Sequence, residues 1–199
     1  MNPLAPRLAE MLHRIGAIRF GKFTLKDGRQ SPFYVDLRVL ISDPPVLRAV
    51  AQAMLERATG LPYHRLAGLP YAGLPIAVAM SLESGTPLIY PRKESKSYGT
   101  QKQIEGKFTA GERALVIDDV ITSGGAKIEA VEPLRSAGLV IEDVLVLVDR
   151  SADRGAALRP HGLTLHSVLR VEDLLQPLRD AGRITADELR AAEAFLGDN

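Results

Sequence analysis

Apolar positions in the first sixty residues follow a helical spacing, then a mixed pattern, then a helical spacing again. The first set predicts an amphipathic helix that ends near Gly16, and it consists of Leu4, Leu8, Met11, Leu12 and Ile15. Residues 18–40 hold scattered β-forming residues and predict short strands with a turn at 26–28. Asp43 is a good helix cap with Pro44 just inside it, so a helix is expected to about residue 59.

From residue 66 onward, short apolar runs alternate with segments of helical spacing. Strands are expected at 66–69, 87–90, 114–118, 144–149 and 163–169. Helices are expected at 76–82, around Ile128, Val131 and Leu134, and twice within 171–196. Pro133 should kink or shorten the helix that contains it. Because the strands are continuously apolar, the expected fold class is α/β, with a central, mostly parallel sheet flanked by helices. Ligands of such sheets bind at the carboxyl ends of the strands.

Composition narrows the classes of function. The chain has 199 residues, of which 46% are hydrophobic and 25% charged, which is typical of a single folded domain. Cysteine is absent, which excludes disulfides, thiolate nucleophiles and Cys-ligated metals. The net charge of +1 gives no overall attraction to nucleic acid or membrane. No apolar run is long enough to span a bilayer, and residues 1–16 lack the features of a signal peptide, so a soluble cytoplasmic protein is expected.

The candidate chemistry is concentrated in residues 114–126. There an apolar strand leads to Asp118 and Asp119, a loop of small residues follows at 122–125, and a helix then begins. Glycines let the backbone approach a phosphate, and loop N–H groups with a helix N-terminus supply donors and partial positive charge. The two carboxylates are suited to accept hydrogen bonds from sugar hydroxyls and to stabilise positive charge on a ribose ring. The segment therefore predicts a ribose-5-phosphate site.

The alternative for this segment is a buried strand followed by an ordinary turn, with Asp119 or Thr122 capping the helix. It lacks the Gly-Lys-Ser/Thr ending of a P-loop and the Gly-x-Gly-x-x-Gly of a dinucleotide site. The segment resembles the PRPP-binding motif of the type I phosphoribosyltransferases. The resemblance implies that fold with a small N-terminal hood, and it implies PRPP contacts from Asp118, Asp119, Val120, Ile121, Thr122, Ser123, Gly124, Gly125 and Ala126.

A cationic segment at 92–107 follows the strand expected at 87–90. Its basic residues are Arg92, Lys93, Lys96, Lys102 and Lys107, against only two acidic residues, Glu94 and Glu105. Few apolar anchors and two glycines predict a mobile lid over a leaving pyrophosphate, the alternative being a solvated charged loop. The order Arg-Lys-x-x-Lys-x-Tyr-Gly resembles the catalytic loop of orotate phosphoribosyltransferases, which reaches across a dimer. It implies catalytic roles for Lys96 and Arg92 and PRPP contacts from Lys93 and Tyr98; Tyr98 resembles the version in UMP synthases.

Two further segments carry the resemblance. Residues 23–36 resemble the hood of orotate phosphoribosyltransferases and imply that Lys26 contacts both substrates and that Tyr34 contacts orotate. Thr122 and Arg150 are the other implied orotate residues, and the fork of an arginine suits a carboxylate. Taken alone, Lys26 and Arg150 are equally consistent with ordinary surface charge. In the loop at 69–75, Tyr71 and Ala72 are implied to bind pyrophosphate, with Ala72 replacing a lysine of many bacterial members.

The resemblance covers residues 16–175 and implies orotate phosphoribosyltransferase activity in pyrimidine biosynthesis. It implies Mg²⁺ bridged mainly by substrate, with no direct protein ligand, and a homodimer with shared active sites. We expect one phosphoribosyltransferase domain, with a hood at about 1–40, a core at about 41–170 and C-terminal helices at about 171–199. From the length we expect no decarboxylase domain within these 199 residues. The alternatives are a phosphoribosyltransferase for another base and a PRPP-sensing regulator on the same fold.

The histidines fall outside every motif and are expected to be structural or surface residues: His13, His64, His161 and His166.

Overall fold

The computed structural model describes residues 4–25, 28–92 and 103–197. The chain divides into two compact units, and the first combines residues 1–49 with 169–199. The second consists of residues 50–168. No helix in the described part of the chain is both long and apolar enough to cross a membrane. The expected boundaries of hood, core and C-terminal helices remain a prediction.

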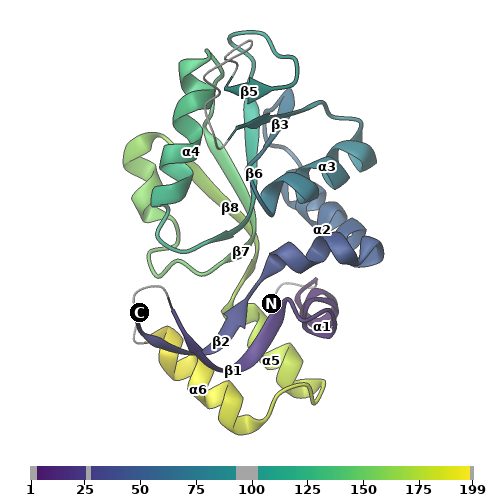
Figure 1. Ribbon diagram of the computed structural model, residues 1–199, viewed down its shortest axis with the longest axis vertical. Coiled ribbons are helices and arrows are strands. Elements are labelled where there is room, and N and C mark those ends of the chain that lie inside the picture. Colours follow the sequence, from purple (N-terminus) through teal and green to yellow (C-terminus); the bar gives the residue numbers. More distant parts are fainter. Residues whose placement is uncertain (1–3, 26–27, 93–102, 198–199) are drawn as a thin grey trace. The chain divides into compact units, whose positions relative to one another are not determined.

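The second unit is built on a six-stranded sheet (Figure 1). Its strand order is β5-β4-β3-β6-β7-β8. The strands are β3 (Arg65–Gly68), β4 (Leu88–Pro91), β5 (Ile104–Glu105), β6 (Ala114–Ile121), β7 (Asp143–Asp149) and β8 (Thr164–Arg170). β3 pairs in parallel with β4 and with β6, and β6 pairs in parallel with β7. β5 is antiparallel to β4. The predicted α/β architecture with a mostly parallel sheet is confirmed.

Helices cover this sheet on both faces. α4 (Gly125–Ser136) lies on one side of β6 and α3 (Gly73–Ser84) on the other (Figure 1). α2 (Pro44–Arg57) begins after Asp43, whose carboxylate accepts a hydrogen bond from Val46 N–H at 3.1 Å, so the predicted cap is confirmed. Burial on both faces explains the unbroken apolar runs of β6 and β7, whose first four and last six residues respectively are buried.

The first unit joins the two ends of the chain. α1 (Ala5–Arg14) packs on α5 (Glu172–Asp180), and α6 (Ala186–Gly197) packs on β2. The short strands expected within residues 18–40 are confirmed as β1 (Ile18–Thr24) and β2 (Gln30–Val35), which form an antiparallel pair. The buried ring of Phe33 meets Phe195 edge-on at 5.9 Å. This aromatic contact ties the C-terminal helix to the N-terminal strands. A short 3₁₀ helix, η1 (Leu37–Ser42), also belongs to this unit, and another, η2 (Ala156–His161), belongs to the second unit.

The structure departs from the sequence prediction in three places. β6 extends to Ile121 and so includes both aspartates, because Val120 and Ile121 keep pairing with β7. Pro133 was expected to kink or shorten its helix, and of these two outcomes shortening does not occur: α4 continues to Ser136, since a proline in the last turn removes only one hydrogen bond of the helix. The third departure is β5, which forms within the cationic segment where a loop was expected.

Candidate active site

Asp118 and Asp119 lie in the last half of β6, at the carboxyl edge of the sheet. Asp118 is buried, with 7% of its surface exposed, whereas Asp119 is partly exposed. The backbone N–H of Asp119 donates to Oδ1 of Asp118 at 2.8 Å, which fixes the first carboxylate against the strand. The buried apolar residues Leu115, Val116 and Ile117 precede the pair and hold it at the end of the core. The pair therefore sits where ligands of parallel sheets bind.

The loop after β6 ends in the N-terminus of α4. Thr122 and Ser123 are exposed, and Gly124 adopts a left-handed conformation with φ of 80°. A Cβ at Gly124 would stand 3.1 Å from Leu158, whereas a Cβ at Gly125 would meet no atom within 4 Å. The first hydrogen bond of the helix runs from Lys127 N–H to the Gly124 carbonyl at 2.9 Å. Open space beside Gly125, next to the free donors of a first helical turn, suits a phosphate.

A lysine that the sequence analysis did not single out completes the acidic pair. Lys127 of α4 forms an ion pair with Oδ2 of Asp118. Its side chain is buried, and 10% of its surface remains exposed. The apolar pattern of the helix marked Ile128, Val131 and Leu134 as inward-facing but gave no sign that a charged neighbour would be buried with them. The one feature of the sequence that could have indicated a role for Lys127 is its position in the first helical turn after the proposed phosphate loop.

The second carboxylate has an unusual acidity. Burial raises the pKa of Asp119 to about 7, and the negative charge of Asp118 and a hydrogen bond between the two side chains act in the same direction. The backbone N–H of Val120 and the charge of Lys127 lower the same pKa and partly oppose the shift. Adjacent carboxylates that share a site commonly behave in this way, and perturbed groups of this kind mark candidate functional sites.

The loop between β3 and α3 lies beside the acidic pair. Leu69 N–H donates to the carbonyl of Ile117 at 2.9 Å, and a cis peptide joins Pro70 to Tyr71. Tyr71 is 67% exposed, while Ala72 is buried at the start of α3. The two residues predicted to bind pyrophosphate therefore lie in a loop attached to the same edge of the sheet.

The structure describes only the two ends of the predicted cationic lid, at Arg92 and at residues 103–107. Arg92 follows β4, and one of its guanidinium nitrogens, Nη1, donates to Glu105 Oε1 at 3.0 Å. Its backbone N–H donates to the carbonyl of Gln103 at 2.8 Å, which anchors the start of the lid to its end. Of the other predicted lid residues, Lys107 is described and exposed, whereas Lys93, Lys96, Tyr98 and Lys102 lie outside the described part of the chain.

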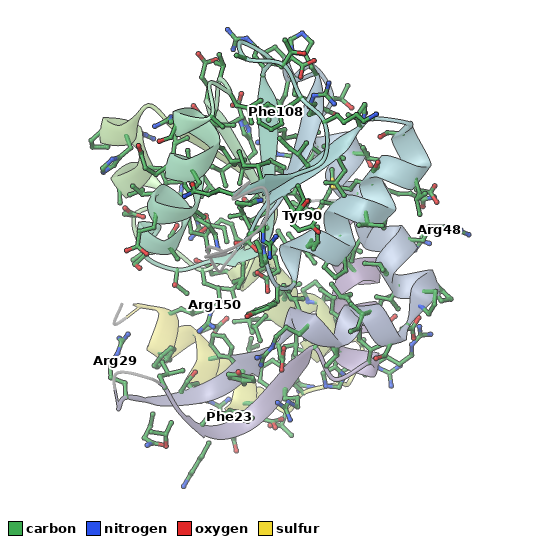
Figure 2. All side chains as sticks on the ribbon, turned by 45° about the horizontal axis from the view of Figure 1, so that its top comes forward. Phe23, Arg29, Arg48, Tyr90, Phe108 and Arg150 are labelled. Atoms are coloured by element: carbon green, nitrogen blue, oxygen red, sulfur yellow. The ribbon has the colours of Figure 1, made fainter. Side chains whose placement is uncertain are left out.

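The predicted orotate residues fall in different parts of the structure. Arg150 directly follows β7 (Figure 2), and its backbone N–H donates to the carbonyl of Ile121 at 2.9 Å. Arg150 and Thr122 thus leave neighbouring strands at the same edge of the second unit. Tyr34 belongs to β2 of the first unit, where its ring stacks on Phe23 at 5.6 Å. Lys26 lies outside the described residues.

Arg150 lies within a buried polar turn, from Asp149 to Ser151, whose hydrogen bonds the sequence analysis did not predict. The carboxylate of Asp149 accepts hydrogen bonds from the backbone N–H and the hydroxyl of Ser151, at 2.7 and 2.5 Å. Both side chains are buried. The turn fixes the direction in which the backbone leaves β7, and so fixes the position from which Arg150 extends.

Comparison with known proteins places this arrangement in a family. The chain is 38% identical to an orotate phosphoribosyltransferase of Cenarchaeum symbiosum over 186 residues, which is 92% of this chain and 93% of that protein. The chain belongs to the orotate phosphoribosyltransferase family. Its fold agrees, because it matches the structure of Leishmania donovani UMP synthase with a TM-score of 0.92 and 40% identity over the whole chain. The predicted type I phosphoribosyltransferase fold is confirmed.

Some relatives are much longer. The chain is 36% identical to bovine uridine 5′-monophosphate synthase over 200 residues, which is 100% of this chain and 42% of that protein. It likewise covers 43% of the Leishmania synthase. The chain thus spans less than half the length of these two relatives. No family model matches the sequence.

Proposed function

We propose that this member of the family is an orotate phosphoribosyltransferase of de novo pyrimidine biosynthesis. It would transfer the ribose-5-phosphate of PRPP to orotate and give orotidine 5′-monophosphate and pyrophosphate. The observation that carries the proposal is the acidic pair of β6 beside the glycine N-terminus of α4. It combines acceptors for the ribose hydroxyls with donors for the 5′-phosphate on one edge of the sheet.

The reaction replaces one bond at the anomeric carbon of the ribose with another. A ring N–H nitrogen of orotate bonds to that carbon and loses its proton to solvent, while the carbon–oxygen bond to pyrophosphate breaks and the electron pair leaves with pyrophosphate. The barrier lies in the leaving group and in the positive charge that develops on the ribose. Asp118 and Asp119 would stabilise this charge, and Thr122 to Ala126 would hold the phosphate.

Mg²⁺ is the proposed cofactor. When bound, it would supply positive charge that neutralises the leaving pyrophosphate. Substrate oxygens would hold it, since Mg²⁺ in phosphate sites commonly relies on the substrate. Within residues 4–25, 28–92 and 103–197, no three His, Asp or Glu side chains gather as a candidate metal site. The carboxylates of β6 would contribute a negative field beside the ion.

Cations of the lid would stabilise the leaving pyrophosphate. Arg92 is the lid cation in the described part of the chain that stands nearest to β4, and its ion pair with Glu105 holds the guanidinium at the base of the lid. In the proposed reaction Arg92 would bind pyrophosphate through its remaining N–H donors, with Lys93 and Lys96 as point charges. Arg150 would bind the carboxylate of orotate, a task for which a guanidinium fork is well shaped.

We further propose a cytoplasmic homodimer in which lids are exchanged. α3 supports it, because this helix follows the Tyr71–Ala72 loop and presents two apolar side chains to solvent. Val78 is 41% exposed and Leu82 is 83% exposed, and Leu82 lies four positions after Val78, so they share one face of the helix. Paired exposed apolar residues next to a proposed active site are typical of a surface that another chain covers.

The proposal is tested by measuring pyrophosphate release from PRPP and Mg²⁺ with orotate, uracil, adenine or hypoxanthine in turn. Orotate should support turnover at least about a hundredfold faster than the other bases, because only orotate carries a carboxylate for Arg150. Faster turnover with a purine or with uracil would replace the proposal by a phosphoribosyltransferase of another base. Binding of PRPP without turnover of any base would favour a regulator.

A further inference from the structure

Lys127 is a buried cation whose position the helix alone does not explain. It occupies the first turn of α4, and the partial positive charge of a helix N-terminus disfavours a lysine there. Only 8% of the residue is exposed, and lysine is rarely buried unless its charge is paired. The partner is Asp118, which is buried as deeply. The ion pair with Asp118, and not an interaction with the helix N-terminus, therefore stabilises the buried lysine.

The two oxygens of the Asp118 carboxylate have different partners. Oδ2 faces the ammonium group of Lys127, and Oδ1 accepts the N–H of Asp119 at 2.8 Å. Oδ1 also lies against α3, because a Cβ on Gly73 would stand 2.7 Å from it. Contacts from α4, β6 and α3 thus fix this carboxylate on three sides, and Lys127 supplies the only cation among them in the described residues.

Lys127 also acts on the second aspartate. In the described part of the chain, the charged side chains that act on Asp119 are Asp118 on the same strand and Lys127 on α4, and they act in opposite directions. Without the ammonium group, two neighbouring carboxylates would repel each other more strongly at a partly buried site, and the pair would take up a proton at a higher pH than it does with Lys127. A protonated acid cannot stabilise a cationic ribose as a carboxylate does.

We propose that Lys127 is a positioning residue, which holds Asp118 in place and supplies a counter-charge that favours the ionised form of the acidic pair. The inference deepens the proposed function and rests on it for the role of the pair. Lys127 itself acts through Asp118 and need not touch substrate.

The first test measures the acidic pair directly and needs no turnover. The carboxyl carbons of Asp118 and Asp119 are titrated by NMR in the parent protein and in Lys127→Met, with Asp119→Asn to assign the signals. The titration midpoint of the pair should rise by about one pH unit or more when the cation is removed. Lys22→Met makes the same change at an exposed lysine of β1 and should leave the midpoint unchanged. An unchanged midpoint in Lys127→Met would overturn the inference.

The second test follows the reaction. The acidic limb of the kcat/KM profile should move to higher pH in Lys127→Met, and Lys127→Arg, which keeps the charge, should restore it in part. A loss of rate that is equal at every pH would assign Lys127 to packing alone and would also overturn the inference. A parent protein that makes no orotidine monophosphate contradicts the proposed function instead, and the NMR titration then still decides the role of Lys127.

The third test applies if Lys127→Met is too unstable for the first two measurements. Loss of one partner leaves a buried charge uncompensated, so the double variant Asp118→Asn/Lys127→Met should regain much of the lost unfolding temperature. A double variant no more stable than Lys127→Met would show that the two side chains are not coupled, and the inference would fail.

Discussion

Gly73 and Asp118 lie so close that a methyl group on the glycine would stand 2.7 Å from both the Cα and the Oδ1 atom of the aspartate. The same methyl group would stand 2.6 Å from the carbonyl oxygen of Ile117. The first residue of α3 therefore rests directly on the backbone of β6 where the acidic pair begins. This contact joins the proposed pyrophosphate loop to the proposed ribose site.

Gly73→Ala and Gly125→Ala form a matched pair of predictions, because each changes the first residue of a helix beside the site. Gly73→Ala should destabilise the fold by about 1–3 kcal/mol, since α3 or β6 must move to admit the methyl group. Gly125→Ala has open space and should keep the stability of the parent, but its methyl group would enter the phosphate cradle and raise the Kd for PRPP about tenfold. Thermal unfolding and PRPP titration separate the two effects. Equal stability of the two variants would contradict the contact with Asp118.

Asp119→Asn should lower kcat about a hundredfold or more, because one of the charges that stabilise the ribose cation is lost. The variant should also unfold at a higher temperature than the parent above pH 7. Burial and Asp118 raise the pKa of Asp119 to about 7, so the folded state favours the protonated acid, and this contribution to stability is lost as pH rises from about 4 through 7. Asparagine has no charge to bury.

The measurement for this prediction is a set of unfolding curves between pH 4 and pH 8, together with steady-state rates. The gain in stability of Asp119→Asn should be greatest at pH 8 and should vanish near pH 4. A variant that is less stable than the parent at pH 8 would contradict the direction of the pKa shift. Unchanged turnover would exclude the proposed contact with the sugar.

Local pattern was sufficient for most of the fold but not for the ends of strands at the site. Aspartate is uncommon in strands, so the apolar run of β6 predicted an end at Asp118. The structure continues the strand because Val120 and Ile121 pair with β7, a contact that only tertiary structure provides. β5 was missed for the same reason, since Ile104 and Glu105 become a strand by pairing with β4. Pairing partners distant in sequence thus decided both elements.

In the candidate site, too, the features set by local sequence could be predicted, and the features set by tertiary contacts could not. The small-residue loop and the two aspartates could be identified from spacing, because the chemistry of a phosphate cradle requires those residue types in a row. The burial of Lys127 could not, since its partner lies nine positions away on another element and nothing in the helical pattern marks it. Likewise the need for glycine at position 73 depends on the closeness of β6, which sequence does not reveal.

Arg150→Lys should raise the KM for orotate about tenfold or more and leave the KM for PRPP nearly unchanged. Lysine keeps the charge but loses the two parallel N–H donors that match a carboxylate, and hydrogen bonds to charged groups contribute about 1.5–3 kcal/mol. Arg159→Lys, at an exposed position of η2, is the control and should change neither constant. Equal KM values for orotate in the parent and in Arg150→Lys would remove Arg150 from the orotate site.

Leu82→Glu should weaken the proposed homodimer at least about tenfold, because a charge would be placed in a face that the second copy covers. The expected result is a shift from dimer to monomer in sedimentation at micromolar concentration, with unfolding temperature nearly unchanged in the monomer. Ala191→Glu, which adds the same charge at an exposed position of α6, should remain dimeric. A parent protein that sediments as a monomer at all concentrations would contradict the dimer, and a dimeric Leu82→Glu would place the interface elsewhere.

Sharing of active sites between two copies is tested by mixing two inactive variants, Lys26→Ala and Lys96→Ala. Both positions lie outside the described residues, and their roles rest on the sequence. If the lid of one copy completes the site of the other, a mixed dimer contains one site with both lysines and one site with neither. Random mixing at equal concentrations makes half of the dimers mixed, so about a quarter of all sites should be intact.

The expected outcome is recovery of about a quarter of the parent activity, measured as pyrophosphate release after mixing. Mass spectrometry of the dimers confirms that mixed dimers have formed. Mixed dimers without activity would mean that each copy supplies both lysines to its own site.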